Sequence, residues 1–161
     1  MGRIYSVPFT ATVTAAGTDT DLWEFIAADD KPILLRGFSL GQISEVKDAE
    51  EEGLRISVKR LLVAVTSGSG GAGGVPESPD SAQVIASFAS ETNNSTVATT
   101  SGATDILDEI GWNVRNTPFD RWYPDREFCP KVKQSEALVI RMETTLADDM
   151  TFVGTAWVEE E

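Results

Sequence analysis

Apolar side chains recur at every second residue along much of this chain. In residues 5–13 aromatic, branched and small side chains alternate with Ser, Pro and Thr, and residues 23–27, 138–142 and 150–158 repeat the pattern. A period of two places alternate side chains on opposite faces of a β-strand, with one face in the core. We therefore expect an all-β fold, an antiparallel β-sandwich with a jelly-roll-like arrangement and long loops. The last two segments predict a terminal hairpin.

The length of the chain favours one domain. Its 161 residues are 41% hydrophobic, and a chain of this size can bury roughly 70% of its unfolded surface in a single core. We expect one β-sandwich domain over residues 1–161, with helix limited to one turn near Asp48 or Ile106.

Two segments change the parity of their apolar positions. In residues 33–40 the apolar positions change from odd to even, and in residues 54–65 they change from even to odd. A strand that keeps its apolar face across such a change needs one extra residue, which forms a β-bulge. The pattern predicts bulges near Gly37 and near Lys59 and Arg60.

Three segments lack the alternation and are expected to be loops. Residues 45–53 are crowded with acidic side chains but lack the ligand spacing of an EF-hand, so they predict a solvated loop or one helical turn. Residues 67–79 are rich in Gly, Ser and Pro without the Gly-Lys-Ser/Thr of a phosphate-binding loop, which predicts a flexible connection. Residues 90–104 predict an extended polar loop, a place where partners are often contacted.

The residue types that most often carry chemistry are scarce. The chain has no histidine and a single cysteine, Cys129, so the commonest general base and metal ligand is missing. We expect a structural or binding protein with no catalytic residues, no metal and no cofactor. Carboxylate pairs such as Glu24 with Asp29, or Asp105 with Glu109, keep a glycoside hydrolase as the more distant alternative.

The charge balance bears on partners and location. The chain carries 13 basic and 26 acidic residues, a formal charge of −13, which repels phosphate backbones and anionic headgroups. We expect no direct contact with nucleic acid or membrane. The lone Cys129 cannot form an intramolecular disulfide, and the N-terminus has no charged stretch followed by a long apolar run, so we expect synthesis in the cytoplasm without secretion.

Residues 112–133, the aromatic–basic segment, have the strongest local signal. Five of the thirteen basic residues lie here beside five of the thirteen aromatic residues, and three prolines make the segment irregular. This composition is typical of an interface core, and the candidate partner-binding residues are Trp112, Arg115, Phe119, Arg121, Trp122, Tyr123 and Arg126. The alternative is that the aromatic side chains plug an open end of the sandwich and the arginines pair with acids.

Several short motifs together resemble a known family. They are Met-Gly-Arg-Ile-Tyr at the start, Leu40-Gly-Gln-Ile-Ser, Asp48-Ala-Glu-Glu-Glu, Leu54-Arg, Thr66-Ser-Gly-Ser-Gly-Gly, Trp112-Asn-Val-Arg and the closing Thr-Ala-Trp-Val-Glu-Glu. In these motifs, over nearly the whole chain, the sequence resembles the small cement or decoration proteins of tailed-bacteriophage capsids. The resemblance implies a β-sandwich or jelly-roll, commonly trimeric, on the exterior of an icosahedral virion head.

This resemblance sets the functional expectation. A cement protein reinforces contacts between subunits of the major capsid protein, and that task needs no active site. We expect a homotrimer, because the aromatic–basic segment would leave an apolar patch on a monomer and closed rings bury such patches. The alternative is a jelly-roll module of the phage particle that binds a carbohydrate or host receptor, with Trp112, Trp122 and Tyr123 as a stacking platform.

Overall fold

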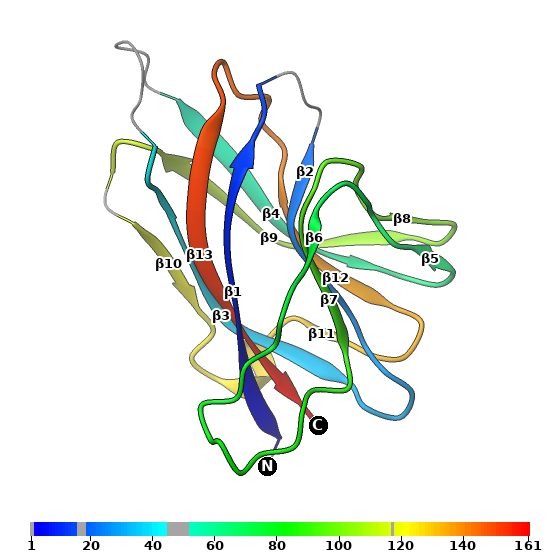
Figure 1. Ribbon diagram of the computed structural model, residues 1–161. Helices are drawn as coiled ribbons and strands as arrows, with labels where there is room; N and C mark the ends of the chain where they lie inside the picture. The colour runs from blue at the N-terminus through cyan, green and yellow to red at the C-terminus, as the bar shows by residue number, and fades with distance from the viewer. Residues whose placement is uncertain (1, 16–18, 45–51, 117) are drawn as a thin grey trace.

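Two antiparallel sheets pack face to face as a β-sandwich in the computed structural model (Figure 1), which describes residues 2–15, 19–44, 52–116 and 118–161. Sheet A has the order β1 (Arg3–Val13), β13 (Met150–Glu160), β3 (Ile33–Gln42) and β10 (Phe119–Trp122), with β11 (Lys131–Val132) also paired to β3. Sheet B has the order β6 (Ala72–Gly73), β7 (Ala89–Asn94), β2 (Thr20–Ile26), β12 (Ala137–Met142), β4 (Gly53–Leu61) and β9 (Thr104–Asn113). A two-stranded ribbon joins β5 (Val65–Thr66) to β8 (Thr99–Thr100). The all-β sandwich expected from the sequence is confirmed.

The core lies between the sheets and follows the predicted alternation. On β1 the side chains of Tyr5, Val7 and Phe9 are buried, while their neighbours along the strand face outward. Trp23 of β2 is fully buried, lies edge-on to Phe9 with ring centroids 4.6 Å apart, and donates its indole N–H to the Val7 carbonyl at 2.9 Å. The indole therefore fills the core and leaves no buried donor unpaired.

The bulge expected near Gly37 is confirmed. Gly37 lies opposite Trp157, but the next residue of β13, Val158, lies opposite Leu35. Arg36 is the extra residue of β3 at this point, so the apolar positions change parity while the strand keeps one face in the core.

The irregularity expected near Lys59 and Arg60 is also present, but its cause is different. The pairing of β4 with β9 shifts between Val58 and Lys59, and the extra residue, Leu107, belongs to β9. The register of β4 against β12 is continuous. The parity changes because Leu61 buries its side chain on the other face of sheet B, in a second cluster formed by Leu61, Ala98, Ala137 and Val139.

The prediction of a terminal hairpin is wrong. β12 pairs with β2 and β4 in sheet B, and β13 pairs with β1 and β3 in sheet A. The chain therefore crosses from one sheet to the other between these strands. Alternation marks both strands but cannot specify which neighbour each one pairs with.

The glycine-rich region, predicted as a loop, contains paired residues. β6 pairs with β7, and Ser69 forms a bridge with Thr96. A Cβ on Gly71 would lie 2.1 Å from the Thr92 carbonyl oxygen. Only glycine allows the two backbones to approach so closely.

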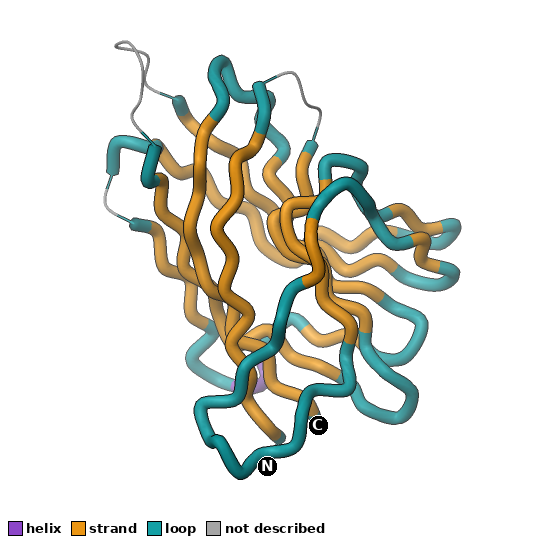
Figure 2. The backbone as a smooth tube through the Cα atoms, viewed as in Figure 1, coloured by secondary structure: helices purple, strands orange, loops and turns teal. Residues whose placement is uncertain are grey.

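Residues 74–88 continue as a loop that closes one side of the sandwich (Figure 2). Glu77 exchanges two backbone hydrogen bonds of 2.8 Å with Ser6, and the Val84 carbonyl accepts a bond of 2.7 Å from the Tyr5 hydroxyl. Phe88, at the end of the loop, is buried. The loop thus connects β1, an edge of sheet A, to the β6–β7 edge of sheet B.

The remaining loop and helix predictions have mixed outcomes. The polar region 90–104 contains most of β7, all of β8 and the first residue of β9, so the long unpaired loop is wrong. In the described residues the single helical element is a 3₁₀ turn, η1 (Arg126–Phe128), and Ile106 lies in β9. The acidic stretch at Asp48 lies outside the described residues. No helix in the described ranges is long and apolar enough to cross a membrane.

Candidate interaction surface

The aromatic–basic segment lies at the side of the sandwich opposite the 74–88 loop, where β10 and β9 form the free edges of the two sheets (Figure 1). It contains β10, the η1 turn and β11. β10 pairs only with residues 37–40 of β3, and Pro118 and Pro124 flank it. The prolines keep the strand short, because they cannot donate to a ladder.

Three of the predicted contact residues belong wholly or partly to the core. Trp112 is 6% exposed and packs against Phe152, and Tyr123 is 8% exposed. Phe119 is half-buried and lies 5.7 Å from the Phe38 ring. These three aromatic side chains therefore fit the alternative interpretation, in which the aromatic residues of the segment fill the sandwich and do not contact a partner.

The arginines near β10 form ion pairs with acids of the same chain. Arg121 of β10 reaches Asp108 of β9 at 2.6 Å, and Arg126 lies 3.1 Å from Glu159 and 2.6 Å from Glu161. Arg115 is exposed at the end of β9, where its backbone N–H donates to Asn113. The positive charge of Arg121 and Arg126 is thus compensated locally.

Asp108 also connects the two sheets. Its Oδ2 accepts hydrogen bonds from Arg121 at 2.6 Å and from the Tyr123 hydroxyl at 3.0 Å. Burial and the neighbouring negative charge of Asp108 raise the pKa of Tyr123, so the phenol stays protonated and remains a donor. An inward charge and the bulge at Leu107 both discourage the β9 edge from pairing with another strand.

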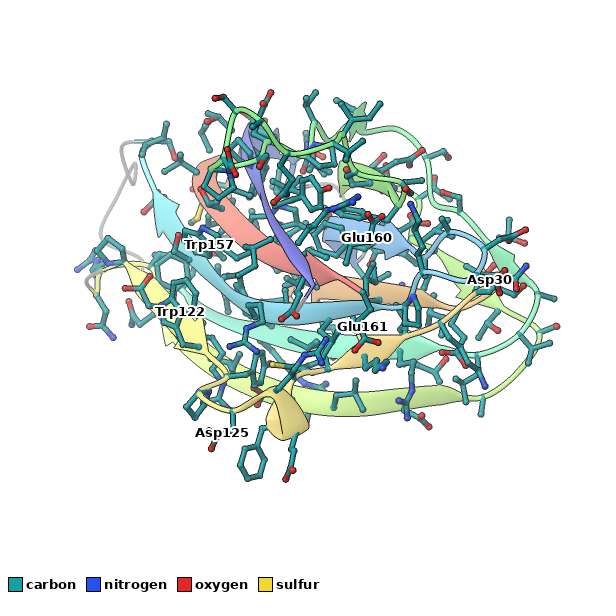
Figure 3. All side chains as sticks on the ribbon, turned by 90° about the horizontal axis from the view of Figure 1, so that it is seen from below. Asp30, Trp122, Asp125, Trp157, Glu160 and Glu161 are labelled. Carbon is teal, nitrogen blue, oxygen red and sulfur yellow. The ribbon has the colours of Figure 1, made fainter. Side chains whose placement is uncertain are left out.

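Trp122 differs from its aromatic neighbours, because its side chain is 52% exposed. It stacks on Trp157 of β13 with ring centroids 4.6 Å apart, and the two indoles lie together on the outside of sheet A in Figure 3. Gly37 lies between them in the sheet, opposite both residues. A Cβ there would lie 2.7 Å from the Trp122 ring, so the missing side chain lets the indoles meet.

The indole pair belongs to a wider surface that we name the sheet A face. Cross-strand register places on it Ser6, Pro8, Thr10, Thr12, Ser39, Asp120, Trp122, Thr151, Val153, Thr155 and Trp157. From the Ser6–Trp157 pair to the Thr12–Thr151 pair, Asp120 is the single ionisable residue of this face, although 24% of the chain is charged. Glu159 and Lys131 follow in the next row, where Glu159 pairs with Arg126 at 3.1 Å. The part of the face between the Ser6–Trp157 and Thr12–Thr151 pairs is exposed or half-buried and nearly free of charge.

A hollow opens beside this face, between β9 and the η1 turn. Its lining includes Leu107, the Arg121–Asp108 pair and the ring of Phe128, which is 68% exposed. Pro124 contributes to the same lining. The hollow therefore extends the apolar surface around Trp122 onto the free edge of sheet B.

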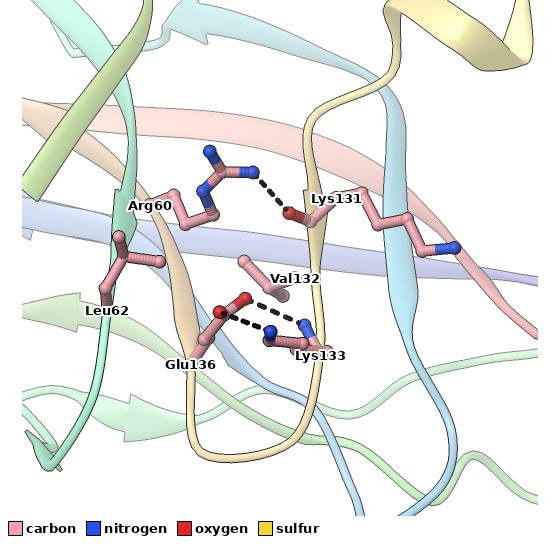
Figure 4. A pocket seen from close by; sticks show the side chains of 6 residues that line it. All are labelled: Arg60, Leu62, Lys131, Val132, Lys133 and Glu136. Atoms are coloured by element: carbon pink, nitrogen blue, oxygen red, sulfur yellow. Dashed lines mark hydrogen bonds and ion pairs between the residues drawn. The ribbon is translucent and has the colours of Figure 1, made fainter.

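A second hollow lies at the end of the sandwich, between β4 and β11 (Figure 4). Arg60 donates to the Lys131 carbonyl at 3.3 Å, and Glu136 accepts from the backbone of Lys133 at 3.1 Å. These polar groups are bonded to one another.

The carboxylates considered for hydrolysis differ in burial and have separate partners. Glu24 is buried in sheet B, whereas Asp29 is exposed. Asp105 bonds Arg60, and Glu109 bonds Arg55. Within the part of the chain that the structure describes, no three His, Cys, Asp or Glu residues are arranged to hold a metal ion.

Comparison with protein-family models, with curated proteins and with solved structures finds no match for this chain. The functional inference therefore rests on the geometry of the molecule. Sequence reasoning located Trp122 but missed Trp157 as its stacking partner. The available signal was the outward position of Trp157 in the alternating segment 150–158.

Proposed function

We propose that the protein is a structural cement or decoration protein that docks on the exterior of a phage head through the sheet A face. The observation that carries this proposal is a bare, charge-poor face with a stacked indole pair, on a chain whose net charge is −13. The partner is the major capsid protein, and the contact reinforces the junctions between its subunits.

The composition of the face supports docking on protein. Interface cores are depleted of charged residues and enriched in aromatic ones, because ionised groups are costly to dehydrate. Ser and Thr hydroxyls on the sheet A face can exchange water for partner groups, and Trp122 and Trp157 supply a large apolar contact. The acidic remainder of the surface keeps free copies soluble before they assemble.

The hollow around Phe128 and Leu107 suits contact between copies of this chain. Both side chains are exposed apolar groups beside the sheet A face. A closed ring buries such a patch, so we propose a homotrimer with jelly-roll connectivity, made in the host cytoplasm and located on the virion. Light scattering that gives the mass of one chain, both free and released from the particle, would contradict the trimer.

Trp122→Ala tests the docking. We expect weaker binding to the capsid by about 2 kcal/mol or more, roughly thirtyfold, measured as occupancy on purified particles at fixed protein concentration. The isolated variant should keep its fold, because Trp122 is half-exposed and its stack with Trp157 contributes about 0.5 to 1.5 kcal/mol. Unchanged occupancy would reject the proposal.

Trp112→Ala is the matched control. Trp112 is buried against Phe152, so its truncation should lower the free energy of unfolding by about 3 to 5 kcal/mol. Comparison of the two variants separates a surface tryptophan from a core tryptophan in the same segment.

The receptor-binding alternative keeps one supporting observation, the exposed indole of Trp122 next to Asp120. The platform expected from Trp112, Trp122 and Tyr123 is not formed, since two of the three are buried. Loss of binding to a cell-surface glycan in Trp122→Ala, with capsid occupancy unchanged, would favour this second function.

A further inference from the structure

A buried carboxyl group holds the glycine-rich segment, residues 67–74, against the outer face of sheet B. Glu24 is 1% exposed, and its Oε2 accepts hydrogen bonds from the Gly68 backbone N–H at 2.9 Å and from Asn94 Nδ2 at 3.0 Å. The other N–H of Asn94 donates to Glu91 Oε2 at 2.8 Å. Glu24 thus connects β2 both to β7 and to the glycine-rich segment.

Two oxygen atoms at this point need a donor. In the described residues, Glu24 Oε1 and Asn94 Oδ1 are both buried and have no hydrogen-bond partner. They belong to the carboxyl and amide groups that the Nδ2–Oε2 bond already joins. A neutral carboxylic acid and a primary amide can form two parallel bonds, N–H to carbonyl and O–H to amide oxygen. One proton on Oε1 would therefore supply the donor that Oδ1 lacks.

Other ionised groups face Glu24, and the nearest cations have other partners. Asp21 of the same strand pairs with Arg141 of β12 at 2.6 Å, and Lys59 of β4 pairs with Glu143. From β7 the carboxylate of Glu91 approaches through Asn94. No ion pair among the described residues reaches Glu24 itself.

These surroundings favour the protonated form. Burial, the largest influence, raises the pKa of Glu24, hydrogen bonds from Gly68 and Ser67 lower it, and the charges of Asp21 and Glu91 raise it again, with a net increase above the usual 4.5.

We propose that Glu24 is a neutral carboxylic acid in the folded protein and forms a two-point acid–amide pair with Asn94, which latches the glycine-rich segment onto sheet B until a rise in pH removes the proton. The folded state then holds a proton that the unfolded chain releases near pH 4.5. The stabilisation is fully present below that pH and declines as the pH rises toward the folded-state pKa. The inference is independent of the proposed docking.

Carboxyl carbon NMR shifts of the intact wild-type protein test the protonation state directly. We expect the Glu24 carboxyl to keep the shift of a neutral acid at pH 4.5, the usual pKa of a glutamate, and to titrate above it. Glu77, which is exposed, serves as the internal reference. A Glu24 carboxyl that ionises at or below pH 4.5 would overturn the proposal.

Glu24→Gln supplies an independent measurement. A glutamine amide can donate to Asn94 Oδ1 and accept from Asn94 Nδ2 and Gly68, so the variant should fold and its stability should lose the slope that Glu24 contributes above pH 4.5. Glu77→Gln removes the same charge from the 74–88 loop and should keep that slope. A wild-type slope in Glu24→Gln would overturn the proposal.

Hydrogen exchange of the Gly68 amide locates the latch. We expect exchange to accelerate by about tenfold or more in Glu24→Ala relative to Glu24→Gln, because the buried acceptor is lost. Equal Gly68 protection in these two variants would contradict the assignment of the latch to Glu24.

Discussion

The outer faces of the two sheets differ in cover and in charge. On sheet B the β5–β8 ribbon and the glycine-rich segment cover Val139 and Leu61, and ionised groups such as Asp21 and Arg141 are buried beneath them. On sheet A the surface between the Ser6–Trp157 and Thr12–Thr151 pairs is bare, and Asp120 is its single ionisable residue. Charge is thus buried where the chain itself supplies the counter-ion. It is nearly missing from the surface that the proposed partner would dehydrate.

The largest effect on the free energy of unfolding is expected at a buried ion pair on the covered outer face of sheet B. The Asp21 side chain is fully buried, and it accepts from Arg141 at 2.6 Å and from the Ala98 backbone at 2.7 Å. Asp21→Asn would leave the guanidinium without its counter-ion and should lower the free energy of unfolding by about 3 to 5 kcal/mol. Urea denaturation measures the change.

Asp105→Asn is the control for this comparison. Its pair with Arg60 is about one-third exposed on each side, so its loss should cost less than about 1 kcal/mol. Equal losses in the two variants would mean that burial is not what separates these ion pairs.

An intermediate effect is expected where the cover approaches sheet B most closely. Gly71→Ala would place a Cβ 2.1 Å from the Thr92 carbonyl oxygen and force β6 away from β7. We expect a loss of about 1 to 3 kcal/mol in the free energy of unfolding, measured by thermal or urea denaturation. Gly73→Ala, whose Cβ meets nothing within 4 Å, should change stability by no more than about 0.5 kcal/mol. Similar losses in both would reject the close-approach explanation.

The smallest effect on stability is expected on the bare face. Thr155 lies in the middle of sheet A, between Pro8 and Ser39 of the neighbouring strands. Thr155→Lys should leave the free energy of unfolding within about 0.5 kcal/mol, because the ammonium can reach water. Capsid occupancy should nevertheless fall strongly, since docking would bury the charge. A large loss of stability, or full occupancy, would break the contrast between the faces.

The aromatic–basic segment shows how far composition can guide a site. Composition singled out residues 112–133, but it could not separate the buried Trp112 and Tyr123 from the exposed Trp122. Burial follows from periodicity only inside regular elements, and the prolines interrupt the period here. Trp157 lay inside a regular strand, so its outward direction was predictable although its partner was not.

Two bulge predictions show the same limit. The parity change at Gly37 follows from the extra residue Arg36 within β3. The similar change around Leu61 arises because Ala98, Ala137 and Val139, which are distant in sequence, pack with Leu61 on the other face of sheet B. The odd or even positions of apolar residues in one strand show that the buried face changes. They do not show which part of the chain covers the newly buried face.

Local patterns in the sequence are sufficient to predict the all-β class, the acidic surface and the strands that line the core, because alternation and charge are local properties of the chain. Tertiary structure decided which strands share a sheet, which outer face is covered, and which tryptophan reaches solvent. The indole pair needs Trp122, Gly37 and Trp157 side by side on three strands, and the Glu24–Asn94 contact needs β2 beside β7. Such juxtapositions depend on long-range pairing, which local patterns do not encode.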